Sequence, residues 1–446
     1  MFTFKGGTHI NEYKLTKDFP TEKIGAPRSV AISMSQHIGA PCTPTVAEGD
    51  RVLVGQIIGD VAPDKLGCPV HASVSGTVKG IEQILGASGM KESCVVIEND
   101  GLDEPVGGLA PFEGDIAAAD AEAIIDTVRR AGITGMGGAA FPSYAKIKSA
   151  LGHADTVIVN CAECEPFITS DHRLLLEEPE RVVGGLKIIL IALGVKRALI
   201  AVEDNKRDAA KVLEKIVDGD MIRVCLMKTK YPQGDERQLI YALTKTELPM
   251  GMLPMDAGCV IFNAGTCSAV YDAFRSGLPL VKRIVTVSGD CVKKPGNYVV
   301  PLGMRVSEIV EKCGGLVKEP RKIIFGGPMM GKSEWSLDTP VKKGTSAILL
   351  LSEDFESKPV KDPECIRCGR CVKNCPMHLM PAYIAQYSRL GDMEMAKKFG
   401  AMSCVECGTC SYNCPAKIEI VQYIRSAKNN IKAEERRLAA LKKSGS

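Results

Sequence analysis

The spacing of hydrophobic positions changes several times along the chain. Over residues 1–115, short apolar runs such as RVLVGQIIGDV and SCVVIEND alternate with turns rich in Gly and Pro. This spacing predicts a small β domain. Over residues 116–280, strand-like runs such as TVIVN and RALIAVE alternate with helical patterns such as KRDAAKVLEKIVD. Such alternation predicts a parallel α/β sheet.

The rest of the chain contains three further patterns. Residues 281–352 return to β-rich character around one short helical run, RVSEIVEKCG. Residues 353–420 begin as a linker and then carry two groups of cysteines, with a helix predicted over 381–399. A charged helical tail follows over residues 421–446. We therefore expect a multidomain α/β protein with these five segments as its units.

Membrane insertion is not predicted. The most apolar stretch, residues 182–195, contains Lys187 and is shorter than the about 20 apolar residues that a spanning helix needs. It predicts a buried helix instead. Residues 1–10 lack the apolar core of a signal peptide. Any membrane association is expected to come through partners or the protein surface.

Composition narrows the class of protein. A chain of 446 residues with 45% hydrophobic residues can bury several cores. Its formal net charge of +3 is too small for a nucleic-acid surface across the whole molecule. The chain has 18 cysteines, and those outside the two groups are scattered. This distribution favours metal-bound thiolates in a reducing compartment over disulfides.

The two cysteine groups are quartets with the same x2, x2, x3 spacing, and each is followed by proline. In this ferredoxin pattern, the fourth cysteine of each run ligates the other cluster. We therefore predict two 4Fe–4S clusters. One has the ligands Cys365, Cys368, Cys371 and Cys414, and the other has Cys375, Cys404, Cys407 and Cys410. Zinc bound by CxxC pairs is the alternative, but the repeated spacing favours clusters.

Four loops of the predicted α/β domain carry candidate binding residues. In GITGMGGAAFPSYAK, glycines precede a helix predicted from Ser143, so backbone amides could approach a phosphate that Lys146 could also reach. The other loops follow strands and contain NCAECEPF, YPQGDERQ and FNAGT. Ligands bind at the carboxyl edge of parallel sheets. A solvated loop is the alternative for any one of these motifs taken alone.

These four motifs resemble those of the flavin- and NADH-binding subunit of respiratory complex I, which binds FMN and NADH on a Rossmann-like domain. The whole order of features resembles the C subunit of Rnf complexes along nearly the entire chain. That order is an FKGGTH start, a lipoyl-like barrel-sandwich domain, the FMN domain, a β-grasp segment with FGGPMMG and a two-cluster ferredoxin module. The resemblance implies a ferredoxin:NAD oxidoreductase that translocates sodium ions or protons, with non-covalent FMN and NAD(H) as substrate.

The resemblance also implies site residues. Those expected to contact FMN are Gly135, Gly137, Gly138, Lys146, Asn160, Glu163, Tyr231, Gly234, Asp235, Glu236 and Asn263. Phe141 and Glu165 are expected at the NADH site. Ala162 and Ala264 depart from the complex I pattern, which has an aspartate and an asparagine there. No general acid or base is expected, because the cofactors carry the chemistry.

The same resemblance implies a location and partners. The resemblance implies a peripheral position on the cytoplasmic face of the cell membrane, with integral-membrane and ferredoxin-like subunits as partners. Residues 416–446 hold eight Lys or Arg against three Glu, which predicts either electrostatic docking or a solvated helix end. Two other functions stay open. One is an FMN and iron–sulfur cobalamin reductase of bacterial microcompartments, and the other is a non-catalytic electron-relay protein.

Overall fold

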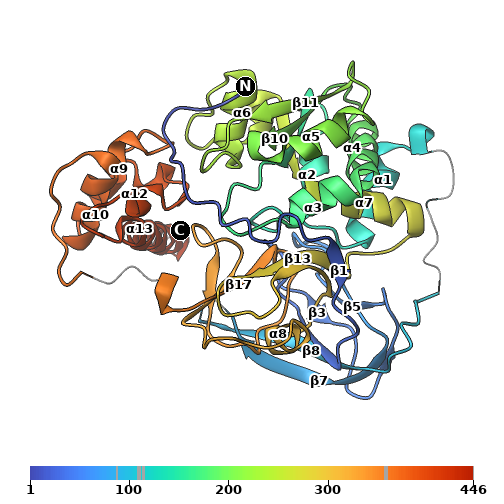
Figure 1. The fold of residues 1–446 in the computed structure, drawn as a ribbon. Helices are drawn as coiled ribbons and strands as arrows, with labels where there is room; N and C mark the ends of the chain where they lie inside the picture. The colour runs from blue at the N-terminus through green and yellow to red at the C-terminus, as the bar shows by residue number, and fades with distance from the viewer. Residues whose placement is uncertain (87–88, 108–111, 113–115, 356–359, 445–446) are drawn as a thin grey trace.

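The computed structural model describes residues 1–86, 89–107, 112, 116–355 and 360–444. In Figure 1, the parallel α/β domain lies above two β-rich domains, and the helical module of the C-terminal residues, coloured orange to red, lies to one side. The N-terminal segment, in dark blue, runs past both the α/β domain and the helical module before it reaches the β-rich domains.

The predicted parallel sheet is present. Its four strands pair in the order β11-β10-β9-β12, and every pair is parallel. The strands are β9 (Thr156–Cys161), β10 (Ala198–Glu203), β11 (Ile222–Met227) and β12 (Cys259–Asn263). The first strand in sequence, β9, lies between β10 and β12, so the chain order reverses direction at the β9–β12 pair. Open α/β sheets bind ligands at such a switch point.

Helices cover this sheet, so β9, β10 and β12 are buried along nearly their whole length. The helices are α1 (Ala121–Arg130), α2 (Ser143–Ala150), α3 (Ser170–Glu177), α4 (Pro179–Leu193), α5 (Arg207–Glu214), α6 (Glu236–Thr244) and α7 (Ala264–Ser276), with short turns η1 (Ile116–Ala118), η2 (Asp204–Lys206) and η3 (Pro254–Ala257). The apolar stretch predicted to be a buried helix forms α4. It crosses α7 closely at Gly185, where an added Cβ would lie 1.8 Å from the Cys267 carbonyl oxygen.

The N-terminal β domain consists of two facing antiparallel sheets, with strand orders β2-β8-β7-β4 and β3-β5-β6. Their strands are β2 (Ser29–Ser33), β3 (Thr43–Pro44), β4 (Arg51–Val52), β5 (Ile57–Asp60), β6 (Val70–His71), β7 (Gly76–Leu85) and β8 (Lys91–Asn99). Apolar residues from both sheets form one buried cluster that includes Val30, Ile58 and Ile97.

A six-stranded sheet with the order β1-β14-β13-β17-β15-β16 forms the second β-rich domain. Its elements are β1 (Thr21–Lys23), β13 (Lys282–Ser288), β14 (Gly296–Pro301), α8 (Val306–Lys312), β15 (Lys322–Phe325), β16 (Lys332–Glu334), β17 (Ala347–Leu351) and η4 (Glu353–Phe355). The edge strand β1 pairs in parallel with β14, although nearly 280 residues separate them. The N-terminal segment therefore contributes to a domain formed mainly by residues 281–352.

The C-terminal module is helical, with α9 (Arg370–Lys373), α10 (Pro381–Arg389), α11 (Met393–Lys398), η5 (Ala401–Ser403), α12 (Thr409–Tyr412) and α13 (Ile420–Ser444). The single helix predicted over 381–399 is two helices, because Gly391 follows α10 with a left-handed φ of 74°. Within the described ranges, no helix has the length and hydropathy that crossing a bilayer requires.

One buried lysine joins three of the domains. The Lys343 side chain, in the loop before β17, is fully buried, and its Nζ donates to the carbonyl oxygens of Pro69 at 2.8 Å and Gly132 at 2.7 Å. Its backbone N–H donates to Gln36 Oε1 at 2.8 Å. Burial lowers the pKa of the Lys343 ammonium, so these acceptors compensate a large desolvation cost.

Replacing Lys343 with Met should destabilise the protein. The change keeps an unbranched side chain but removes two charge-assisted hydrogen bonds, each worth about 1.5–3 kcal/mol. We expect the midpoint of thermal unfolding to fall by about 5–10 °C. Lys211→Met, at an exposed position on α5, is the control and should shift the midpoint by about 1 °C or less. Equal midpoints for the two variants would show that the Lys343 contacts contribute nothing.

Candidate functional site

Two predicted asparagines lie at the carboxyl ends of the two strands at the switch point. Asn160 of β9 and Asn263 of β12 are direct partners in the strand register. The Asn160 Nδ2 donates to the Gly234 carbonyl oxygen at 2.8 Å, and the Asn263 Nδ2 donates to Asp171 Oδ2 at 2.6 Å. Asn160 Oδ1 also accepts the N–H of Ala162 in the loop after β9, and Asn263 Oδ1 caps helix α7 by accepting the Gly265 N–H. The side chains thus tie the strand ends to neighbouring loops.

The glycine loop lies against this edge. An added Cβ on Gly137 would lie 3.0 Å from Asn263 Cβ, whereas a Cβ on Gly138 would meet no atom within 4 Å. The Gly135 N–H closes the loop by donating to the Phe141 carbonyl oxygen at 2.8 Å. Close packing on one side and open space beside Gly138 leave room for a ligand next to the main chain.

Lys146 on α2 points back to the same edge. Its Nζ lies 3.1 Å from Glu236 Oε1 and donates to the Ile261 carbonyl oxygen at 3.0 Å. Glu236 is the first residue of α6, and the preceding Asp235 caps that helix by accepting from the N–H groups of Arg237 and Gln238. Lys146 and Glu236, which are 90 positions apart in sequence, therefore meet at the start of α6.

Glu163 has a structural role in its loop. It adopts a left-handed φ of 48°, and its carboxylate accepts the Asp171 N–H at 2.7 Å, at the start of α3. Burial and the nearby Glu163 charge raise the pKa of Asp171. Asp171 links Glu163 to Asn263, and sequence reasoning missed it because it lies in an ordinary first helical turn.

Tyr231 and Glu165 make their contacts with other domains. The buried Tyr231 hydroxyl donates to the carbonyl oxygen of Cys407, in the helical module, at 2.8 Å. The Glu165 carboxylate accepts the N–H groups of Met329 at 3.0 Å and Met330 at 2.8 Å, in the FGGPMMG loop. Burial raises the pKa of Glu165 to about 7 against the opposing effect of these donors. Both residues lie where the α/β domain meets its neighbours.

Two lysines that the sequence did not predict hold the NCAECEPF loop. Lys14 Nζ donates to the carbonyl oxygens of Glu163 at 2.8 Å and Glu165 at 2.9 Å. Lys206 Nζ donates to the Ala162 carbonyl oxygen at 2.7 Å and lies 3.3 Å from Glu203 Oε2. Lys206 follows a buried strand of the parallel sheet, and this position could have indicated its role at the site. Lys14 lies in a polar segment without periodicity and gave no signal.

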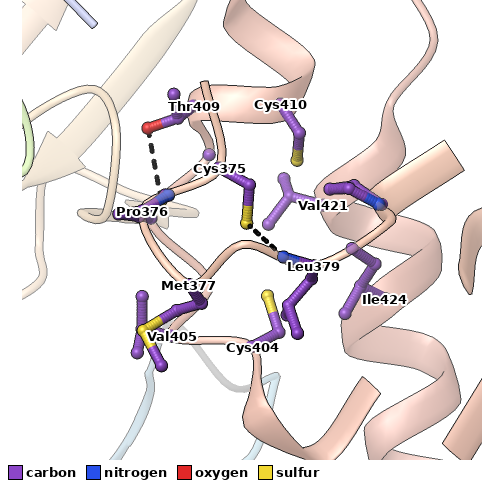
Figure 2. Close-up of a pocket in the computed structure, with 13 residues that line it drawn as sticks. Cys375, Pro376, Met377, Leu379, Cys404, Val405, Thr409, Cys410, Val421 and Ile424 are labelled. Atoms are coloured by element: carbon purple, nitrogen blue, oxygen red, sulfur yellow. Dashed lines mark hydrogen bonds between the residues drawn. The ribbon is translucent and has the colours of Figure 1, made fainter. Parts of the chain in front are cut away.

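Four of the predicted cluster cysteines line one cavity in the helical module. They are Cys375, Cys404, Cys407 and Cys410, together with apolar residues such as Leu379 and Ile424. Figure 2 shows the thiols of Cys375, Cys404 and Cys410 directed towards a shared space. Backbone N–H groups approach two of the sulfurs, from Leu379 to Cys375 at 3.4 Å and from Glu406 to Cys404 at 3.3 Å. The cavity therefore offers sulfur ligands in apolar surroundings.

The two quartets adopt the same backbone conformation. Equivalent residues share left-handed φ values, 57° at both Arg367 and Glu406, and 71° and 77° at Gly369 and Gly408. The same holds for the residues three positions after each fourth cysteine, with values of 53° and 58°. The second quartet thus repeats the loop of the first.

The predicted ligands of the other cluster differ in exposure. Cys365 and Cys368 are exposed, whereas Cys371 and Cys414 belong to the buried core of the module. Within the residues that the structure describes, no three His, Cys, Asp or Glu side chains are grouped closely enough for a single metal ion. A 4Fe–4S cubane does not require such a close grouping, because each thiolate binds a different iron.

Comparison with known protein families divides the chain in the predicted order. Residues 2–102 match the RnfC barrel sandwich hybrid domain, and residues 128–272 match the Nuo51 FMN-binding domain. Residues 284–333 match the SLBB domain, and residues 364–419 match a 4Fe-4S dicluster domain. These matches confirm the FMN-binding and iron–sulfur domains, and they favour clusters over zinc.

Relatives extend over nearly the whole chain. It is 46% identical over 440 residues, covering 98% of both chains, to the C subunit of the Na⁺-translocating ferredoxin:NAD⁺ oxidoreductase complex of Acetobacterium woodii. It is 42% identical over 434 residues to the C subunit of the proton-translocating complex of Clostridium ljungdahlii, covering 97% of this chain and 94% of the relative. An NAD⁺-reducing [NiFe]-hydrogenase structure aligns with 20% identity and a TM-score of 0.49, over 71% of this chain and 62% of the other.

The N-terminal domain match and the full-length relatives distinguish this chain from the cobalamin reductases considered above. The FMN-binding match likewise argues against a relay protein without a nucleotide site. The chain belongs to the family of C subunits of the ion-translocating ferredoxin:NAD⁺ oxidoreductase complexes, the Rnf complexes.

Proposed function

We propose that this chain exchanges hydride between NAD(H) and FMN and passes single electrons through its helical module to partner subunits. Bound FMN supplies the conversion between a two-electron hydride and single electrons. The observation that carries the proposal is the direct contact between the two sites, in which Tyr231 of the FMN-binding domain donates to Cys407 beside the cysteine cavity. This contact supports a flavin site and an iron–sulfur site that lie next to each other.

The residues at the switch point suit FMN. The open main chain at Gly138 and the Lys146 ammonium provide donors for a phosphate, and the two asparagine amides lie beside them. We assign FMN binding to all the residues implied by the motifs, namely Gly135, Gly137, Gly138, Lys146, Asn160, Glu163, Tyr231, Gly234, Asp235, Glu236 and Asn263. Phe141 and Glu165 are assigned to NADH. Two of these, Tyr231 and Glu165, would act from the domain boundary.

The finer fold descriptions belong to the same proposal. We describe residues 116–280 as a Rossmann-like domain, residues 281–352 as a β-grasp domain and residues 353–420 as a ferredoxin-like module, with residues 1–115 before them and the tail 421–446 after them. The reversal of strand order at β9–β12 supports the first description. The repeated quartet conformation supports the third.

Lys146→Ala should weaken FMN retention, because it removes a cation from the phosphate site. We expect flavin content per chain after gel filtration to fall several-fold, measured by absorbance after denaturation. Lys148→Ala is the matched control, because Lys148 is exposed on the same helix and should leave flavin content unchanged. Equal occupancy in the two variants would remove Lys146 from the site.

The exposure of the cysteines supports an order for the two clusters. We assign Cys375, Cys404, Cys407 and Cys410 to the cluster nearer the flavin, because Tyr231 contacts the Cys407 loop. Cys365, Cys368, Cys371 and Cys414 would hold the outer cluster, since Cys365 and Cys368 lie at the surface. Electrons would then leave the chain from the exposed side of the module.

Anaerobically purified chain should contain about eight irons, as expected for two cubanes. Cys368→Ser should disturb only the outer cluster, so the NADH-dependent EPR signal of the inner cluster remains. Cys407→Ser should remove the inner cluster and block NADH-dependent reduction of the outer one. NADH-to-dye activity through the flavin should persist in both. If Cys407→Ser leaves reduction of the outer cluster at the wild-type rate, the proposed order is wrong.

We further propose that the chain docks peripherally on the cytoplasmic face of the membrane, against integral-membrane and ferredoxin-like subunits of its complex. The names of its relatives as ion-translocating complexes support this location. Helix α13 packs on the module through Ile424 and Ile431, and beyond them Leu438 is 47% and Leu441 58% exposed. Arg425 and Lys428 pair with Glu406, so docking would rely on the end of the helix.

Deleting residues 433–446 should lower recovery of the chain with membranes that contain the other subunits, while NADH-to-dye activity stays at the wild-type level. Because exposed charges are screened over about 8 Å at physiological ionic strength, recovery of the full chain should fall as salt rises. Co-sedimentation across a salt series measures both effects, with Lys211→Glu as a surface-charge control. Equal recovery of full-length and truncated chains would place docking elsewhere on the molecule.

A further inference from the structure

The N-terminal strap, defined as residues 2–14 (FTFKGGTHINEYK), contains the FKGGTH motif that the proposed chemistry does not use. In Figure 1 it runs as a dark blue trace from the FMN-binding domain past the helical module. It begins on the outer edge of the parallel sheet, where the Phe2 N–H donates to the Leu226 carbonyl oxygen at 3.0 Å and the Lys228 N–H donates to the Phe2 carbonyl oxygen at 2.8 Å.

The middle of the strap contacts both cysteine loops. The Gly7 N–H donates to the Asn374 carbonyl oxygen at 2.9 Å, and Thr8 Oγ1 lies 3.3 Å from Asn413 Oδ1. Asn374 and Asn413 are equivalent residues that immediately precede the fourth cysteine of each quartet. The strap therefore touches the two points at which ligation is predicted to cross between the clusters.

Glycine is required at position 6 by geometry. Gly6 has a φ of 75°, and an added Cβ would lie 2.5 Å from the Cys375 carbonyl oxygen and 3.1 Å from Pro376 Cα. Both neighbours are main-chain atoms beside a cavity-lining cysteine, so neither can move without moving the loop. The first glycine of the FKGGTH motif is therefore needed because the main chain of the strap passes so close to the module that a side chain would not fit.

The same segment holds Tyr231. The N–H groups of Thr8 and Tyr231 donate to each other's carbonyl oxygens at 2.8 and 2.9 Å, and an added Cβ on Gly7 would lie 2.6 Å from the Tyr231 carbonyl oxygen. The Tyr231 hydroxyl then reaches the Cys407 carbonyl oxygen. Strap, Tyr231 and the Cys407 loop form one continuous hydrogen-bonded path between the domains.

The end of the strap returns to the flavin site. The Phe167 N–H donates to the Glu12 carbonyl oxygen at 2.9 Å, and Lys14 binds the carbonyl oxygens of Glu163 and Glu165. The buried apolar core of the helical module is separate from the cores of the FMN-binding domain. Polar and main-chain contacts, such as those of Gly7 with Asn374 and of Tyr231 with Cys407, therefore set the position of the module.

We propose that the N-terminal strap is a positioning element that holds the Cys375 and Cys407 loops at a fixed distance from the flavin site, so that electron transfer into the module depends on it. The inference rests on the proposed function. Electron-transfer rates fall steeply with distance, so a small displacement of the module slows transfer even when both sites remain intact.

The test uses full-length, anaerobically purified chain with Gly6→Ala. Gly49→Ala is the matched control, because Gly49 also has a left-handed φ of 90° but no atom within 4 Å of an added Cβ. In Gly6→Ala, we expect the rate of NADH-driven cluster reduction, followed by stopped-flow absorbance and freeze-quench EPR, to fall at least tenfold. Iron content, flavin content and NADH-to-dye activity should match those of the control.

A second readout does not depend on activity. Hydrogen exchange of peptides that cover residues 374–377 and 404–410 should become at least fivefold faster in Gly6→Ala and stay unchanged in Gly49→Ala. Unchanged exchange together with wild-type cluster reduction overturns the proposal. A parallel loss of NADH-to-dye activity in Gly6→Ala also overturns it, because the strap would then act on the flavin site.

Thr8→Val provides an independent test if Gly6→Ala does not fold. This variant removes the hydroxyl contact to Asn413 and keeps the main-chain pairing with Tyr231. Cluster reduction should slow about two- to threefold, and an unchanged rate overturns the proposal. Failure of the proposed function is distinguishable, because wild-type chain would then show no NADH-driven reduction of either flavin or clusters.

Discussion

The parallel pairing of β9 with β12 determines where every other functional element can lie. Because the two strands run side by side in register, Asn160 and Asn263 end at the same edge of the sheet. The glycine loop packs against Asn263 at this edge, and Lys146, on the helix after that loop, meets Glu236 at the start of α6. A four-stranded sheet with its order reversed at this pair thus creates one open edge for a nucleotide.

Lysine ammonium groups fix the loops around that edge. Lys14, Lys206 and Lys343 each donate to main-chain carbonyl oxygens on other segments. An ammonium has three donors on a flexible stem, so it can join carbonyl groups that regular secondary structure leaves unpaired. Burying such a charge is costly unless its donors are satisfied. These three side chains therefore hold irregular loops in single conformations, which a site for a large planar cofactor requires.

The helical module is attached to the α/β domain differently from the six-stranded domain. Apolar side chains of the α/β domain and of the six-stranded sheet form one shared core, whereas the module has a core of its own. Its position depends on a few close main-chain contacts, at Gly6, Gly7, Tyr231 and Cys407. Such contacts define geometry well but bury little apolar surface. The arrangement suits a protein in which two redox sites must keep a fixed separation.

The sequence by itself determined the features that depend on local spacing. Cysteine spacing predicted the iron–sulfur domain, and alternating strand and helix patterns predicted the parallel sheet. The strand-end motifs predicted ligand-binding loops, and their resemblance to a known family implied FMN. Each of these signals depends on residues close together in the chain. Only the tertiary structure decided that β1 pairs with β14, that Glu165 binds the FGGPMMG loop and that Tyr231 reaches Cys407. These contacts join residues more than 150 positions apart, and their partners are mostly main-chain groups that every residue carries. Side-chain identity therefore contains no signal for them, and only the packing of whole domains brings them together.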